Sequence, residues 1–270
     1  MNNKKKFEQP EVASNTVAVL SAKLLEANKK LQQAERERTL MIENISHDLR
    51  APLTAIRSTV DYMLEVNRQE GSIPRKEQEA MLSLLDVRTR TLEVLVNDLY
   101  YMTCLESGRE ELKLSKVPLI QFLEEYFFAA EIDEKYEEYL LKLEADEDLE
   151  VCVNIDVAKF SRVLDNLFTN ARKYSKEGSE ITLGAGAEGG KAFFYVKDNG
   201  QGIPEEALPY IFDRTYRVSG ARTPSKESSS GLGLAIAKSI VEQHGGKITC
   251  ESTLEEGSCF RVELPALGDE

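Results

Sequence analysis

Small and apolar residues recur along the first part of the chain with the spacing of a helix that packs against other helices. They stand at positions 13, 17, 20, 24, 27, 31, 34, 41 and 45. Steps of four and three alternate in this series when Arg38 is included as a seam position, which is a heptad pattern. The pattern predicts one long helix from about Val12 to Arg68, with residues 12–46 as a coiled coil. Residues 1–11 are expected to be disordered.

A second helix is predicted after a break at residues 69–74. Gly71 allows a turn there, and Pro74 suits the first turn of a new helix. The apolar stripe of this helix, which ends near Ser107, consists of Met81, Leu85, Leu92, Leu95, Leu99 and Met102. Two antiparallel helices bury two such stripes poorly by themselves. We therefore expect an all-α helical hairpin that forms a four-helix bundle as a homodimer.

The periodicity changes beyond residues 109–118, which read as a linker. Residues 119–145 are predicted to be mostly an acidic helix, and Asp156 is positioned to cap a helix that runs through Phe168. Short apolar runs predict strands at residues 151–155, 181–183, 192–196, 248–251 and 259–264. Strands and helices in this order predict an α/β sandwich for a second domain, residues 119–265.

The composition excludes several classes of function. A net charge of −13 and a pI near 4.9 argue against a nucleic-acid-binding surface. The four cysteines contain no CxxC pair, so they indicate neither a zinc site nor a disulfide framework and fit a reducing cytoplasm. No apolar run approaches the roughly 18 residues needed to cross a bilayer, so we expect no membrane segment in this chain.

One of only two histidines, His47, stands where the helical seam changes phase. The seam there runs through positions 41, 45, 49, 52 and 56, so that two steps of four follow each other. His47 is two residues from the nearest seam positions, which turns its imidazole toward water. Asp48 follows directly. Pro52 lacks the amide that would bond the carbonyl of Asp48, which is expected to loosen the helix.

The stretch Ile42–Ile56 resembles the H-box of sensor histidine kinases, the dimerisation and phosphoacceptor helix of two-component systems. The resemblance implies that His47 accepts a phosphoryl group with the help of Asp48, in a dimerisation and histidine phosphotransfer domain at residues 40–108. It implies that residues 12–46 are a signalling helix. The chain is then cytoplasmic, either by itself or as the cytoplasmic part of a membrane sensor.

Four further stretches resemble, in their order and rough spacing, the ATP-binding domain of histidine kinases, the Bergerat fold shared with gyrase, Hsp90 and MutL. They are Asn166–Tyr174 (the N-box), Asp198–Ile203 (the first glycine box), Ile211–Arg217 (the F-box) and Ser230–Ile236 (the second glycine box). The resemblance implies a site for ATP and Mg²⁺. Its predicted residues are Asn166, Asn170, Lys173, Tyr174, Asp198, Gly200, Gly202, Ile203, Phe212, Gly231, Leu232, Gly233 and Leu234.

The chemistry of these side chains suits such a site. Asn166 and Asn170 are four residues apart on one helical face and present two amide oxygens to Mg²⁺. Lys173 adds a positive charge near the phosphates, and Tyr174 offers an aromatic face to the base. The carboxylate of Asp198 can accept the adenine amino group. The glycines let the backbone approach the ligand closely, and the second glycine box opens a helix whose amino end suits anions.

Two features depart from the family pattern. Ser228–Ser230 stand where glycines often lead into the second glycine box, in the segment 213–230 that reads as a mobile ATP lid. Ala51 stands where many kinases that are also phosphatases of their response regulator have a threonine or asparagine to hold water. Alanine has no donor or acceptor, so we expect weak phosphatase activity. The second histidine, His244, precedes two glycines and is expected to cap a helix end.

The predicted function is ATP-dependent autophosphorylation of His47, followed by transfer to an aspartate in the receiver domain of a response regulator on another chain. Two alternatives stay open. One is an ATP-driven conformational switch, as in the chaperone and repair relatives, although those have a glutamate base where this chain has Asn166. The other is a degenerate kinase that serves as a dimeric scaffold, against which the presence of His47, Asn170 and Asp198 argues.

Overall fold

The computed structural model describes residues 10–69, 72–107, 111–145, 149–214, 216 and 231–267. The chain divides into two compact units, residues 1–47 and 48–270. Of the segment predicted to be disordered, residues 1–9 lie outside the described residues, while Pro10 and Glu11 already belong to the first helix. The turn residue Gly71 also lies outside the described residues.

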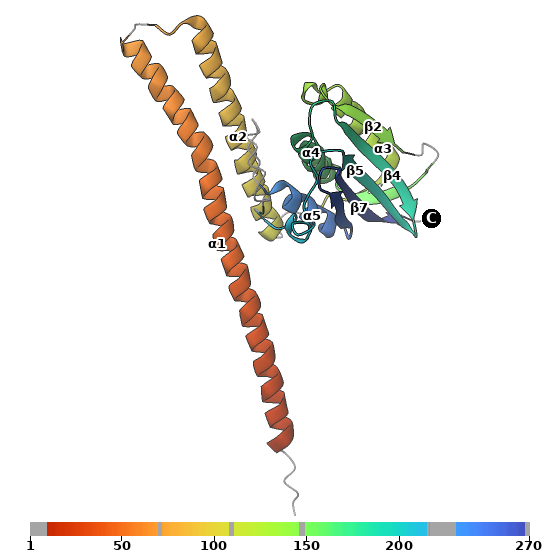
Figure 1. Cartoon of the computed structure of the whole chain (residues 1–270). Helices are drawn as coiled ribbons and strands as arrows, with labels where there is room; N and C mark the ends of the chain where they lie inside the picture. Colours follow the sequence, from red (N-terminus) through yellow and green to blue (C-terminus); the bar gives the residue numbers. More distant parts are fainter. Residues whose placement is uncertain are drawn as a thin grey trace, which may run out of the picture. The chain divides into compact units, whose positions relative to one another are not determined.

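Two long helices begin the chain and confirm the helical prediction (Figure 1). Helix α1 spans Pro10–Gln69 and helix α2 spans Arg75–Ser107. The predicted apolar stripe of α2 is turned inward, because Leu95 and Met102 are buried and the other four stripe residues are half-buried. Helix α1 continues through Pro52, so the expected loosening does not interrupt it.

The remainder of the described chain contains a seven-stranded sheet. Its strands are β1 (Ser115–Pro118), β2 (Leu140–Glu144), β3 (Cys152–Ile155), β4 (Glu180–Glu188), β5 (Lys191–Asp198), β6 (Lys247–Thr253) and β7 (Gly257–Leu267). The strand order is β1-β3-β7-β5-β4-β2, and β6 pairs with β7 beside this path. All pairs are antiparallel except β2 with β4.

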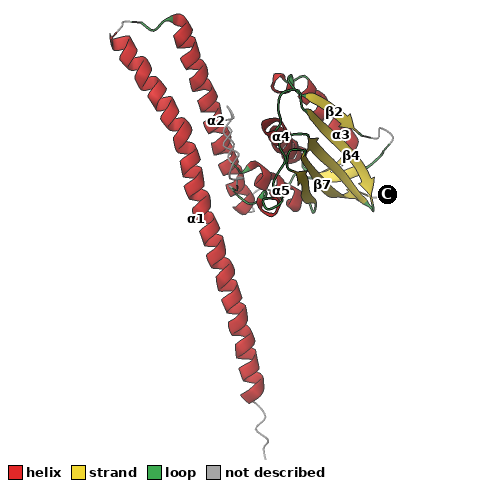
Figure 2. Cartoon of the chain, in the orientation of Figure 1, coloured by secondary structure: helices red, strands yellow, loops and turns green. Residues whose placement is uncertain are grey.

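Three helices, α3 (Leu119–Glu131), α4 (Val157–Tyr174) and α5 (Gly233–Gln243), lie on one face of this sheet (Figure 2). Short 3₁₀ turns, η1 (Glu134–Tyr136) and η2 (Leu208–Tyr210), connect elements. Phe160 and Phe168 of α4 and Phe194 of β5 are fully buried between the two layers. The predicted α/β sandwich is therefore confirmed, and its apolar core holds α4 and the strand ends in place.

Two strands were not predicted. Ser115–Pro118, which the sequence places in the linker 109–118, form β1 and pair with Cys152–Ile155. The predicted acidic helix of residues 119–145 ends early, because Asp133 accepts a hydrogen bond from the amide of Lys135 and starts η1; β2 follows. Both strands have only four or five residues and lie at the sheet edges, where a period-two pattern is too short to recognise. The domain limits themselves remain predictions.

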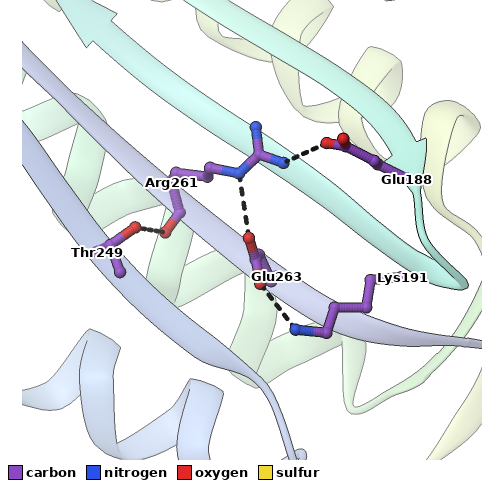
Figure 3. A network of polar contacts seen from close by, with 5 residues as sticks. All are labelled: Glu188, Lys191, Thr249, Arg261 and Glu263. Carbon is purple, nitrogen blue, oxygen red and sulfur yellow. Dashed lines mark hydrogen bonds and ion pairs between the residues drawn. The ribbon is translucent and has the colours of Figure 1, made fainter.

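The face of the sheet opposite the helices carries a network of polar contacts (Figure 3). Arg261 Nε donates to Glu263 Oε1 at 3.3 Å, and Lys191 Nζ donates to Glu263 Oε2 at 3.1 Å. The bond from Lys191 is the main reason that the pKa of Glu263 is lowered. The guanidinium of Arg261 also stacks over the ring of Phe193, 3.5 Å from its centroid. These contacts link β5 to β7 and satisfy one another, so they stabilise the sheet rather than form a binding site.

Candidate functional site

The phosphoacceptor candidates lie on α1. The side chain of His47 is exposed, as the seam predicts, and Asp48 is half-buried. Met41 and Ile45, the seam positions before His47, are both buried. On the same stretch Ser46 Oγ donates to the carbonyl of Ile42 at 2.7 Å, a bond within the helix. The imidazole is thus presented to solvent by a regular helix.

Helix α4, which carries the N-box, is anchored at its first turn. Asp156 caps it by accepting from the amide of Lys159 at 3.2 Å, as predicted, and also accepts from the amide of Lys113 at 3.0 Å. Although burial opposes the effect, these two N–H groups lower the pKa of Asp156 below its usual value. The start of α4 therefore holds a stable carboxylate cap.

The second histidine ties α4 to α5. His244 is the residue that ends α5, as predicted, and its Nδ1 donates to the carbonyl of Ile240 at 2.7 Å. Its Nε2 accepts from the amide of Asp156 at 3.0 Å, a contact that the sequence did not predict. Burial lowers the pKa of His244, which favours the neutral ring that this acceptor role requires. His244 is thus a structural residue, and it sets the position of α4 against α5.

Helix α4 has one apolar and one polar face. The apolar face packs into the core, and the polar face presents Asn166, Asn170, Lys173 and Tyr174 to a cavity of about 860 Å³. Gly231, Gly233 and Leu234 of the second glycine box line the same cavity. This volume lies in the usual range for small-molecule sites. The structure therefore brings together seven of the predicted nucleotide-binding residues.

Asn166 has the environment of a ligand-binding residue. Its Nδ2 is buried and has no hydrogen-bond partner among the described residues. Buried amide groups nearly always have hydrogen-bond partners, so an unpartnered donor at this position is typical of a residue that bonds to a ligand. A Cβ atom at Gly233 would lie only 2.9 Å from Asn166 Oδ1, which explains the glycine at the start of α5.

Asp198 ends β5 and is 5% exposed. Burial raises the pKa of this carboxyl, although the N–H groups of Gly200 and Ser258 act in the opposite direction. The bond from Gly200 reaches Asp198 Oδ1 at 2.9 Å. Each carboxylate oxygen can accept more than one hydrogen bond, so this buried carboxylate can also accept from an amino group of a ligand.

The glycines after Asp198 connect it to the end of α4. A Cβ at Gly200 would lie 2.4 Å from the carbonyl oxygen of Tyr174, and Gln201 donates its amide to that oxygen at 3.0 Å. Gly202 has a φ of +68°, and a Cβ there would lie 2.0 Å from the carbonyl oxygen of Thr253. Only glycine allows these approaches, and through them the first glycine box adjoins the N-box.

Six predicted residues do not line the cavity, and three of them instead make packing or loop contacts. The amide of Ile203 donates to Ser252 Oγ at 2.8 Å, Leu232 is fully buried, and Phe212 packs edge-on against Phe260 with ring centroids 6.3 Å apart. These contacts fix the loops that carry the site. The other three are Asp198, Gly200 and Gly202, of which Gly200 lies against both the carbonyl oxygen of Tyr174, a cavity residue, and Asp198 Oδ1.

The cavity also contains residues that the motifs did not indicate. Thr169 lines it beside the N-box asparagines, and Ile211 and Tyr216 line it from the F-box. Helical spacing from Asn166 and Asn170 could have identified Thr169. Most of the predicted lid, residues 215 and 217–230 with Ser228–Ser230 among them, lies outside the described residues. No group of three His, Cys, Asp or Glu that could hold a metal occurs in the described part of the chain.

Comparison with known proteins finds similarity in both the helical part and the α/β part of the chain. A family model described as "His Kinase A (phospho-acceptor) domain" matches residues 37–108. Another, "Histidine kinase-, DNA gyrase B-, and HSP90-like ATPase", matches residues 155–268. Among curated proteins, the sensor histidine kinase WalK of Bacillus subtilis is 33% identical over 87% of this chain and 38% of its own length. The sensor protein KdpD of Clostridium acetobutylicum is 33% identical over 86% of this chain and 25% of its own length. The chain thus spans about two-fifths or less of these relatives.

Solved structures share the fold. The histidine kinase ThkA, in a complex with the response regulator protein TrrA, matches with a TM-score of 0.68 and 24% identity over 91% of this chain and 67% of that chain. The Acinetobacter baumannii histidine kinase AdeS matches with a TM-score of 0.61 and 18% identity, over 82% of this chain and 98% of that one. No helix among the described residues is long and apolar enough to span a membrane.

Proposed function

Because this chain belongs to the sensor histidine kinase family, we propose that it transfers the γ-phosphoryl group of ATP to His47 and from there to a response regulator. The observation that carries the proposal is the polar face of α4. Asn166, Asn170 and Lys173 converge there on one cavity beside the buried carboxylate of Asp198. The exposed His47 supplies the acceptor.

In the proposed reaction, a ring nitrogen of neutral His47 attacks the γ-phosphorus of ATP. A P–N bond forms, the bond from the γ-phosphorus to the β–γ bridging oxygen breaks, and ADP leaves. Asp48 fixes the tautomer and takes or stabilises the proton on the other ring nitrogen. In the second step the P–N bond breaks as an aspartate carboxylate of the regulator accepts the phosphoryl group. The protein contributes mainly position and charge neutralisation.

The residues around the cavity fit Mg²⁺ bound together with ATP. Asn166 and Asn170 provide amide oxygens for the cation, four residues apart on α4. The unpartnered Nδ2 of Asn166 is a donor, so it suits a phosphate oxygen of the nucleotide rather than the metal. Mg²⁺ is commonly held by few protein groups together with substrate phosphates, and it neutralises phosphate charge when bound. Lys173 supplies a further positive charge, and Asp198 selects the adenine amino group.

The proposed partner is the receiver domain of a response regulator. ThkA, which has the same fold, was solved in a complex with the response regulator TrrA. The proposal places the chain in the cytoplasm, where ATP is available. The primary test is incubation with γ-labelled ATP and Mg²⁺, followed by measurement of acid-labile label on the protein.

We also propose that the chain is a homodimer through α1 and α2. The match to the His Kinase A domain supports this, and so do exposed apolar residues on both helices. On α1, Leu53, Val60 and Leu64 are exposed and lie seven and four residues apart, on one helical face. Leu82, Val96 and Tyr100 are exposed on α2. Leu95, in contrast, is already buried within one chain, so a charge there would test the hairpin and not the dimer.

Replacing Leu64 with glutamate is expected to dissociate the dimer. Leu64 is 51% exposed in the single chain, so the change costs the monomer little, whereas a second copy would bury the carboxylate. Light scattering across a concentration series measures the mass. Ile132→Glu is the matched control, because Ile132 is 86% exposed at the end of α3, outside the two helices. A Leu64→Glu protein that remains as dimeric as the parent would place the interface elsewhere.

Ala51 bears on the dephosphorylation of the response regulator. Its side chain is exposed on α1, one turn after His47, and cannot orient water by hydrogen bonding. We expect the parent to dephosphorylate its regulator slowly and Ala51→Thr to do so several-fold faster, with autophosphorylation unchanged. The assay follows purified phosphorylated regulator with each protein and ADP. Rapid dephosphorylation by the parent would contradict this prediction, and Ala51→Ser separates the effect of the hydroxyl from that of added bulk.

A further inference from the structure

The cavity beside α4 has a second wall, which is provided by α2. The α2 residues that line it are Val87, Arg90, Thr91, Val94, Asn97 and Asp98. Each of these positions lies three or four residues from another of the set, so together they form one face of the helix. Helices α2 and α4 both belong to the compact unit of residues 48–270. The side chains predicted to bind nucleotide therefore face α2 across the cavity.

A buried ionic contact holds α2 in this place. Arg162 of α4 donates from Nη2 to Asp98 Oδ1 at 2.6 Å, and Asp98 is 8% exposed. The guanidinium of Arg162 lies 4.1 Å from the ring centroid of Tyr101, and Lys159 Nζ lies 5.2 Å from the same centroid. A charge-assisted bond with aromatic stacking fixes orientation as well as distance. The α2 wall is thus a specific contact.

The α2 wall carries a cation in reach of the cavity. Arg90 is the one cationic side chain among the described α2 residues that line it. Its Nε is paired with Asp86 Oδ2 at 2.9 Å, one turn back on the same helix. Both side chains of this pair are more than half exposed, so the pair contributes little stability. Arg90 can therefore exchange Asp86 for a stronger anion at low cost.

A guanidinium is well suited to that exchange. It offers several N–H donors in a planar fork that matches phosphate oxygens and stays charged at all relevant pH values. The described part of the opposite wall carries two cations, Lys173 and Arg162, and Arg162 is already paired with Asp98. Lys173 alone is a small counter-charge for a triphosphate with several negative charges. A second cation from α2 would balance this charge across the cavity.

We propose that Arg90 is a phosphate-binding residue of the nucleotide site, supplied by α2 and positioned by the Asp98–Arg162 contact. The inference rests on the proposed function, since it requires that the cavity binds ATP. The nucleotide site then has two halves. The α/β domain provides the adenine contact and the amide groups, and α2 provides one contact to phosphate.

The test compares Arg90→Gln with Arg75→Gln in the full chain. Arg75 is the matched control, because it lies on α2 in an equivalent exposed pair with Glu79, at 2.9 Å, and does not line the cavity. Binding of Mg-ATP and of adenosine is measured by calorimetry. We expect Arg90→Gln to weaken Mg-ATP binding about tenfold, to leave adenosine binding unchanged and to flatten the salt dependence of Mg-ATP binding. Arg75→Gln should bind both ligands as the parent does.

Several results would overturn the inference. Equal Mg-ATP affinity of Arg90→Gln and the parent would exclude the phosphate contact while leaving the proposed function intact. If Arg75→Gln loses as much Mg-ATP affinity as Arg90→Gln, the effect comes from the net charge of the protein and not from a contact between Arg90 and phosphate. A parent that fails to bind Mg-ATP would remove both proposals. As a second measurement, Asp98→Asn should weaken Mg-ATP binding too, and adding Arg90→Gln to it should cause little further loss, because the arginine is then already misplaced. Full additivity of the two changes would show that Asp98 does not position Arg90.

Discussion

Replacing His47 with glutamine is expected to reduce labelling by γ-labelled ATP to background. The imidazole of His47 is the proposed nucleophile on this exposed turn of α1, and glutamine keeps polarity and length without a nucleophilic ring nitrogen. The parent should accumulate label that acid removes and alkali does not, as expected for a phosphorylated imidazole. The fold should be unaffected, because His47 is exposed on a regular helix.

The control for this experiment is Glu43→Gln. Glu43 is exposed one turn before His47, so the change removes a nearby charge and retains the acceptor. It should be labelled as the parent is. Stable label on His47→Gln, or label that resists acid in the parent, would disprove the assignment of His47. Unchanged Mg-ATP binding in His47→Gln would show that the loss of label arises at the acceptor.

Replacing Asp198 with asparagine is expected to weaken ATP binding by about two orders of magnitude. Asp198 Oδ1 already accepts from the amide of Gly200 at 2.9 Å. An asparagine would keep its oxygen on that amide and turn its NH₂ group toward the adenine amino group, so that two donors face each other. Loss of a charge-assisted hydrogen bond and the unpaired donor together cost roughly 3 kcal/mol. Calorimetry with Mg-ATP measures the effect.

The exposed Asp213→Asn is the matched control, since it makes the same chemical change in the F-box outside the first glycine box. A pH series adds an independent check. Burial raises the pKa of Asp198, and the protonated carboxyl loses an acceptor, so ATP affinity should fall on acidification at a higher pH than an ordinary carboxyl would give. Equal ATP affinity of Asp198→Asn and the parent would show that the adenine contact is wrong.

Much of this architecture could be predicted from local sequence. The heptad seam predicted α1, and the fixed side-chain directions of a helix predicted that His47 is exposed. The same periodicity placed Asn166, Asn170 and Lys173 on one face of α4. Asp156 was recognisable as a cap because capping is decided within four residues of chain. Such features depend on neighbours in sequence, so a single sequence contains the information for them.

Contacts between distant segments required the tertiary structure. Strands β1 and β2 are defined by pairing with β3 and β4, and their own residues carry too short a pattern. The bond from Asp156 to His244 joins residues 88 positions apart. No motif indicated that Arg162 would meet Asp98, or that α2 would bring Arg90 to the cavity. The sequence by itself determined the two long helices and the nucleotide motifs and predicted His47 as the acceptor, because those follow from local periodicity and residue chemistry. The tertiary structure alone decided which surface closes the site, because that depends on how separate elements pack.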